Sequence, residues 1–202
     1  AAMLRDGKLA PIADRTALVL APEGQLVEQY RSDALSRSLA RATNSSDCRE
    51  VRLRDVLRAL ESARTDRRIE RVVLDLDRLD ASGFASLREV AAAIGKLRAA
   101  GKQVVAYGDG FTQAQYVLAA QADEIYLDPM GGGVILDGLA SYRPYFREAL
   151  NDKLGVDMHL FKVGEYKSAA EPFIRDDASP ESKEADLFWM NDIWQRMLAD
   201  IG

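Results

Sequence analysis

The chain has 202 residues and a formal net charge of −5, and 48% of its residues are hydrophobic. This composition is typical of a globular protein with a sizeable core, and the acidic balance argues against a nucleic-acid partner. The chain holds one cysteine, Cys48, and one histidine, His159. Metal sites usually combine several such residues, so we expect no metal and no other cofactor.

The first 50 residues carry few regular patterns. Residues 1–15 are interpreted as an N-terminal extension, and the apolar run at residues 16–20 predicts a strand. After a turn at residues 21–24, residues 25–30 are expected to return as the second arm of a hairpin. Residues 31–50 are polar, and we expect them to form a mobile excursion.

Clearer elements follow from residue 51. The helical spacing of apolar residues predicts a helix over residues 51–63, and the apolar run at residues 72–76 predicts a buried strand. Ser82, in the turn that comes next, is a candidate N-cap for another helix. The apolar face of that helix begins near Leu87, and Gly101 is expected to end it.

The alternation of strands and helices continues to residue 163. Strands are predicted at residues 104–107, 125–127 and 157–163, where His159 is expected at a buried or edge position. Helices are predicted at residues 112–120 and 143–154. Strands that alternate with helices predict βαβ units around a mainly parallel sheet, and therefore an α/β fold.

A long helix is predicted at the end of the chain. Ser179 is its expected N-cap, Pro180 suits its first turn, and Glu181 complements the positive end of its dipole. No composition shift interrupts residues 16–170. We therefore predict one domain over residues 16–202, with this helix as a C-terminal extension.

Two kinds of motif suggest ligand sites but favour simpler readings. The glycine-rich turns 108–110 and 131–133 each follow a predicted strand, yet neither precedes the Lys-Ser or Lys-Thr pair of a phosphate-binding loop. Tight turns in which side chains would not fit are the favoured interpretation. Asp75 and Asp77 lie at a strand end, where solvated carboxylates are favoured over a cation site because no third ligand is evident.

The most informative segment surrounds Lys167, which lies just beyond the last predicted strand and precedes Ser168 and two alanines. Small neighbours let a partner surface approach closely, and loss of water lowers the pKa of a lysine from about 10.4 towards neutrality. A lysine in that state can act as a general base. From spacing alone, a solvated loop lysine is the ordinary reading. The downstream Arg175-Asp176-Asp177 indicates either a polar linker or charge pairs that fix the lysine loop.

The residues Tyr166-Lys167-Ser168-Ala169, followed by Glu171-Pro172-Phe173-Ile174-Arg175-Asp176-Asp177, closely resemble the signal peptide peptidase A family. Its long, two-domain form is also called protease IV, and the resemblance is to the amino-terminal domain. It extends over almost the whole chain and includes Ala122-Asp123-Glu124-Ile125-Tyr126-Leu127. The resemblance implies a ClpP/crotonase-like fold, in which βαβ units form a spiral.

The resemblance also implies an activity and a setting. Proteins of this family are serine endopeptidases that degrade released signal peptides and other apolar peptides with a Ser/Lys dyad. They are anchored in the bacterial inner membrane, face the periplasm and form bowl-like homo-oligomers, for which we expect a tetramer. Lys167 matches the general base. The serine is expected in a C-terminal domain of the same protein, and the membrane anchor outside this chain.

This chain is therefore expected to carry half of a site. Gln113 is expected where the second domain carries the serine, and an amide cannot act as a nucleophile. The turn at residues 80–83 lacks the glycine pair expected of an oxyanion hole. Ser168 is expected to orient the Lys167 ammonium rather than to attack substrate, because adjacent residues of an extended segment point to opposite sides. We expect Lys167 to be exposed and the isolated chain to be inactive.

Two other functions remain open. The chain could be a non-catalytic assembly domain of an oligomeric ring, in which Lys167 is structural. It could also be an acyl-CoA enzyme on the same fold, although that activity needs an adenine site and paired oxyanion amides, and neither is visible in the sequence.

Overall fold

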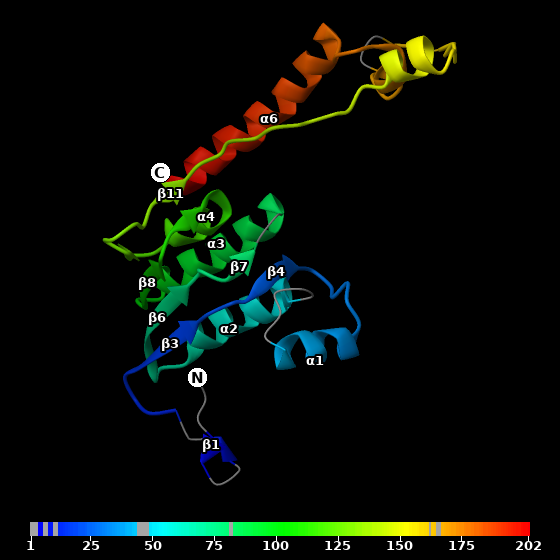
Figure 1. Cartoon of the computed structure of the whole chain (residues 1–202). Helices are drawn as coiled ribbons and strands as arrows, with labels where there is room; N and C mark the ends of the chain where they lie inside the picture. The colour runs from blue at the N-terminus through cyan, green and yellow to red at the C-terminus, as the bar shows by residue number, and fades with distance from the viewer. Residues whose placement is uncertain are drawn as a thin grey trace. The chain divides into compact units, whose positions relative to one another are not determined.

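The computed structural model describes residues 4–5, 8–9, 12–43, 49–80, 83–161, 163–164 and 167–202 (Figure 1). The predictions made for Cys48 and Ser82 lie outside these residues. The chain divides into two compact units, one formed by residues 1–137 with 200–202 and the other by residues 138–199. We describe each unit by itself. The predicted extent of the domain, residues 16–202, stays a prediction.

A four-stranded parallel sheet forms the centre of the first unit. It consists of β3 (Thr16–Leu20), β6 (Ile69–Asp75), β8 (Gln103–Gly108) and β10 (Glu124–Leu127), in the order β10-β8-β6-β3. Val19, Val73 and Val105 lie opposite one another in three adjacent strands. The strands predicted at residues 16–20, 72–76, 104–107 and 125–127 are all present. The apolar side chains of the two central strands are largely buried, whereas β10 at the edge is mostly exposed.

Helices α2 (Leu53–Thr65) and α3 (Phe84–Ala99) pack against each other and contact the central strands (Figure 1). The residues between them are almost fully shielded from solvent: Leu60, Val72, Leu74, Ile94, Leu97, Val104 and Ala106. Both helices match the predicted apolar periodicity. Gly101 follows α3 with a φ of +79°, a backbone conformation that favours glycine after a helix end.

Shorter strands form further parallel pairs beside the central sheet. One small sheet joins β5 (Glu50–Arg52), β4 (Gly24–Val27) and β7 (Leu79–Asp80), and another joins β11 (Val134–Ile135) with β9 (Phe111–Thr112). A separate antiparallel pair joins β1 (Leu4–Arg5) and β2 (Lys8–Leu9). The predicted α/β class is confirmed. The repeating unit contains two strands and a helix, as in β6-β7-α3, and it accords with the ClpP/crotonase-like type that the resemblance implied.

The hairpin predicted at residues 25–30 is wrong. A strand exists there, but β4 pairs in parallel with β5 and β7, not with β3. A local turn signal shows that the chain changes direction, but it does not specify which strand will supply the hydrogen bonds. The polar stretch at residues 31–50 contains helix α1 (Ala34–Ala42), which is held at its start by Asp33. Its mobility stays a prediction.

Helix α4 (Gln113–Ala119) begins at a complete capping box. The Thr112 hydroxyl accepts a hydrogen bond from the Gln115 backbone N–H, and the Gln115 side chain accepts one from the Thr112 N–H. The buried Gln115 amide also donates to the carbonyls of Leu76 and Leu79. These bonds fix the start of α4, and with it Gln113, against the end of β6.

The second unit contains little regular structure before its long final helix. It comprises the π-helix η1 (Glu148–Lys153), the single turn α5 (Glu171–Ile174) and most of α6 (Pro180–Ile201). The helix predicted at residues 143–154 is thus shorter than expected. Helix α6 matches its prediction. Among the described residues no helix has the length and apolar character needed to cross a bilayer.

The strand predicted at residues 157–163 is not formed in the described part of that segment, residues 157–161 and 163. Its alternating apolar side chains, Met158 and Leu160, are exposed, and so is His159, which we expected at a buried or edge position. The physical reason is that a strand needs a neighbour to satisfy its backbone groups. Alternation alone does not provide one.

Candidate active site around Lys167

Lys167 lies in the second unit, between a glycine turn and the helical turn α5. Gly164 has a φ of +101°, and a Cβ placed on it would lie 3.9 Å from both Cγ and Cε of Lys167. The aliphatic stem of the lysine therefore runs past the glycine. The Lys167 side chain is exposed, as the sequence predicted for this chain by itself.

Backbone hydrogen bonds close the loop on the other side of Lys167. The Glu171 N–H donates to the Ser168 carbonyl at 3.0 Å, and the Phe173 N–H donates to the Ala170 carbonyl at 3.0 Å. Pro172 stands in the first turn of α5, where its missing N–H leaves no bond unmade. The loop that carries Lys167 is thus tied directly to α5.

The side chain of Glu171 is the principal anchor of this region. It is only 2% exposed, and its carboxylate accepts hydrogen bonds from the Ser179 N–H at 3.1 Å and the Ser179 hydroxyl at 2.5 Å. The same hydroxyl oxygen accepts from the Ser182 N–H at 3.1 Å, so the prediction that Ser179 caps α6 is confirmed. A buried carboxylate is stable only with such partners. Glu171 was not singled out in the sequence, because an isolated glutamate reads as a solvated residue.

A second set of contacts holds the chain before η1 against the same region. The Arg143 guanidinium donates to the Ser182 hydroxyl at 3.1 Å and to Asp186 at 2.8 Å. The Phe146 N–H donates to the Pro172 carbonyl at 2.6 Å, and the ring of Phe146 stacks on that of Phe173 with centroids 6.3 Å apart. Contacts on both sides therefore secure α5.

The segment Arg175-Asp176-Asp177 forms charge pairs, as one of its two interpretations suggested. Arg147 donates to Asp176, and the hydrogen bond raises the pKa of the Arg147 guanidinium. Lys183 binds Asp177 at 3.0 Å, and this contact lowers the pKa of the Asp177 carboxyl. Both aspartates thus pair with neighbouring cations of the second unit, although exposed pairs of this kind contribute little to stability.

Ser168 does not act as a hydrogen-bonding partner of the Lys167 amine in the described part of the chain. No hydrogen bond links the Ser168 hydroxyl to the Lys167 amine among these residues, so its expected orienting role has no support. Gln113 is the first residue of α4, in the first unit. Lys167 is therefore an accessible amine on an anchored loop, and no serine or histidine among the described residues is hydrogen-bonded to it.

One glycine in each glycine-rich turn is packed tightly, as predicted, whereas a Cβ on Gly131 or Gly133 would meet nothing within 4 Å. A Cβ on Gly108 would lie 2.6 Å from Phe111 Cε1 and 2.9 Å from Asp77 Oδ1, and one on Gly132 would lie 2.5 Å from the Asp128 carbonyl. Asp77 accepts a hydrogen bond from the Asp109 N–H at 2.7 Å, so this carboxylate braces the turn. Among the residues that the structure describes, no group of three potential metal ligands comes together.

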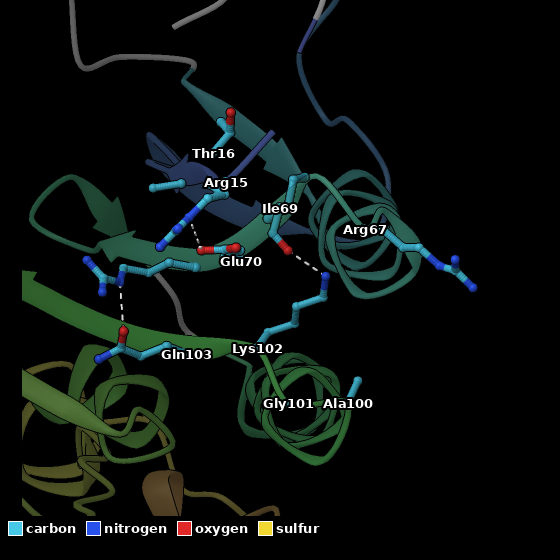
Figure 2. A pocket seen from close by; sticks show the side chains of 11 residues that line it. Arg15, Thr16, Arg67, Ile69, Glu70, Ala100, Gly101, Lys102 and Gln103 are labelled. Atoms are coloured by element: carbon cyan, nitrogen blue, oxygen red, sulfur yellow. Dashed lines mark hydrogen bonds and ion pairs between the residues drawn. The ribbon is translucent and has the colours of Figure 1, made fainter. Parts of the chain in front are cut away.

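A polar cavity of ≈ 570 Å³ lies in the first unit, at the amino-terminal ends of β3, β6 and β8 (Figure 2). Three of its cations are bound to protein atoms: Lys102 donates to the carbonyls of Asp66 and Ile69, Arg71 donates to Gln103 at 2.8 Å, and Arg15 pairs with Glu70. Ligands of open α/β sheets bind at the carboxyl ends of the strands, which is the opposite edge. We therefore assign this cavity a structural role.

Comparison with known proteins identifies the family of this chain. The sequence profile described as peptidase family S49 matches residues 96–202, more than half of the chain, and includes Lys167 and its anchor. The chain belongs to peptidase family S49. The resemblance recognised around Lys167 is thereby confirmed at the level of the family.

Two curated S49 relatives show how much of a longer protein this chain resembles. It is 42% identical over 188 residues to Protease 4 from Salmonella typhi, which covers 91% of this chain and 30% of the relative. It is 36% identical over 196 residues to Protease 4 from Haemophilus influenzae, covering 96% of this chain and 31% of the relative. The S49 chain thus spans about a third of the length of these relatives.

A solved structure assigned as an enoyl-CoA hydratase/isomerase from Acinetobacter baumannii also resembles the S49 chain. It is 14% identical, with a TM-score of 0.38, and the likeness covers 96% of this chain and 93% of the other. At this TM-score we base no inference on it, and the acyl-CoA alternative gains no support.

Proposed function

We propose that this chain supplies the general base, Lys167, of a Ser/Lys endopeptidase whose nucleophilic serine belongs to another domain of the same protein. Membership of peptidase family S49 supports the reaction class. The observation that carries the assignment of the base is the accessible Lys167 amine on a loop anchored by the buried Glu171. In this proposal the isolated chain is inactive, because it holds only one member of the dyad.

The chemistry follows from the properties of a lysine amine. When a second domain covers Lys167, loss of water disfavours its charged form, and the neutral amine can accept the proton of the serine hydroxyl. The serine oxygen then bonds to the carbonyl carbon of the peptide. The lysine ammonium returns the proton to the leaving amine as the C–N bond breaks, and water hydrolyses the resulting ester with the same amine as base.

The substrates and the setting belong to the same proposal. We propose that the substrates are released signal peptides and other apolar peptides, and that the complete protein is a homo-oligomer, a tetramer, anchored in the bacterial inner membrane and facing the periplasm. The names of the Protease 4 relatives support a protease and do not address these finer points.

The test is replacement of Lys167 by Ala in the full-length protein, assayed with a fluorogenic apolar peptide. General-base catalysis contributes about 10²- to 10⁴-fold, so kcat is expected to fall by that factor. Lys183→Ala is the matched control, since Lys183 lies in the same unit and its ammonium pairs with the exposed Asp177. Loss of activity in Lys183→Ala equal to that in Lys167→Ala would reject the assignment.

One observation favours a second candidate, the assembly domain of an oligomeric ring. The second unit exposes an unusual number of large apolar side chains: Tyr142, Leu154, Phe161, Val163, Leu187 and Phe188. Where such exposed apolar side chains gather into one patch, they mark a protein contact. Under this alternative, Lys167→Ala retains full peptidase activity, whereas Phe188→Asp reduces the size of the assembly in analytical ultracentrifugation.

A further inference from the structure

We propose that Glu171 is a positioning residue for Lys167: its buried carboxylate fixes the loop from which the lysine side chain extends. This inference rests on the proposed function and adds a second residue to the same site. It is drawn from three linked features of the second unit, namely the burial of Glu171, its bonds to the start of α6, and the bond from its own backbone to the lysine loop.

Glu171 carries a charge in a place where charges are costly. Its side chain is 2% exposed, and two donors of Ser179, the backbone N–H and the hydroxyl, point to its carboxylate. Burial of a carboxylate without such donors is strongly unfavourable, so the carboxylate and Ser179 hold each other in place. Since Ser179 also caps α6, a helix of 22 residues, Glu171 is fixed to the largest rigid element nearby.

The backbone of Glu171 connects this fixed point to Lys167. Its N–H donates to the carbonyl of Ser168, the residue that follows the lysine. On the other side, Gly164 holds a left-handed conformation and lies against the lysine stem. The lysine backbone therefore lies between two constraints, while the side chain beyond it remains exposed.

Position matters for a base of this kind because the proton must cross a short distance. A general base has to lie about 2.6 to 3.2 Å from the hydroxyl that it deprotonates. Lysine has a flexible four-carbon stem, so a shift of its backbone moves the reachable positions of the amine by a similar amount. The carboxylate of Glu171 is buried and bonded to Ser179, so we assign its effect on the reaction to this placement.

The experiment uses the full-length protein and compares Glu171→Gln, Glu171→Asp and the control Asp192→Asn. Asp192 lies on the same helix α6 but forms an exposed pair with Arg196. We expect Glu171→Gln to lower kcat by about 10- to 100-fold, the equivalent of one lost hydrogen bond to a charged group, with KM changed less than about twofold. Glu171→Asp keeps the charge and is expected to recover part of the loss, and Asp192→Asn is expected to match the wild type.

A double substitution separates positioning from general stability. In a Lys167→Ala background, Glu171→Gln is expected to cause no further loss of the residual activity, because its effect runs through the lysine. An equal loss in both backgrounds would overturn the inference, and so would wild-type kcat in Glu171→Gln. If Lys167→Ala itself were fully active, the proposed function would fail instead, so the two failures are distinguishable. Should Glu171→Gln not fold, Ser179→Ala, which removes the hydroxyl donor, enters the same cycle with the same expected outcomes.

Discussion

Replacement of Ser179 by Ala is expected to destabilise the second unit, because one oxygen atom serves two purposes there. It caps α6 by accepting from the Ser182 N–H, and its proton is donated to the buried Glu171 carboxylate at 2.5 Å. Loss of a helix cap costs about 1 kcal/mol, and loss of a hydrogen bond to a charged group costs about 1.5 to 3 kcal/mol. Because the two losses share one group, we expect a total of roughly 2 to 4 kcal/mol.

The assay is urea unfolding of the chain, followed by the fluorescence of Trp189 and Trp194, both of which lie on α6. Asp192→Asn is the control on the same helix, and it is expected to leave the midpoint unchanged, because an exposed ion pair contributes little. A midpoint of Ser179→Ala equal to that of the control would refute the argument that Glu171 and Ser179 anchor the lysine loop.

Two further predictions concern the first unit. The pKa of Asp66 is lowered to about 2 by its hydrogen bonds with Arg68, so this carboxylate favours the folded state above its ordinary pKa of 3.8 and loses that contribution as the pH falls towards 2. An NMR titration should place its midpoint near 2 in the wild type, and Asp66→Asn should flatten the acid dependence of stability between these pH values; a midpoint near 3.8 would contradict this. Gly108→Ala is expected to cost about 1 to 3 kcal/mol because its Cβ would meet Phe111 at 2.6 Å, whereas Gly131→Ala meets open space and should be neutral in thermal unfolding. Equal stability of the two glycine variants would show that the turn at Gly108 can relax.

Much of the first unit could be predicted from the sequence, because its elements are defined by their own apolar patterns. The runs that became β6 and β8 and the periodic face of α3 are buried where the pattern placed them. Ends of elements with a clear chemical signal, such as Gly101 and Ser179, were also predictable. In these cases the residues that determine an element lie within the element or next to its end.

Other features depend on partners that a local pattern does not specify. The strand at residues 24–27 was expected in a hairpin, but its hydrogen bonds go to β5 and β7, whose positions are set by the whole fold. Apolar and polar residues alternate over residues 157–163 as in a strand. This alternation shows that one face could be buried, but it does not identify the neighbouring strand or surface that would bury it. A strand in that segment is therefore expected only where another strand is available to pair with it.

The candidate site likewise contains one residue that the sequence could identify and one that it could not. Lys167 could be found through the resemblance of its segment to a peptidase family, and the family is confirmed. Glu171 could not, because its importance comes from burial and from Ser179, eight residues further along the chain. No short motif encodes that distance. The structure was needed to show that the carboxylate is an anchor.

The most direct test of the central claim is the rate at which a fluorophosphonate probe phosphonylates the nucleophilic serine, with loss of fluoride, in the full-length protein, measured by single-turnover labelling. The probe reports only on activation of the serine, and not on binding of a peptide. If Lys167 is the base, Lys167→Ala should label at least about 100-fold more slowly than both the wild type and Lys183→Ala. Labelling of Lys167→Ala at the wild-type rate would show that another group activates the serine.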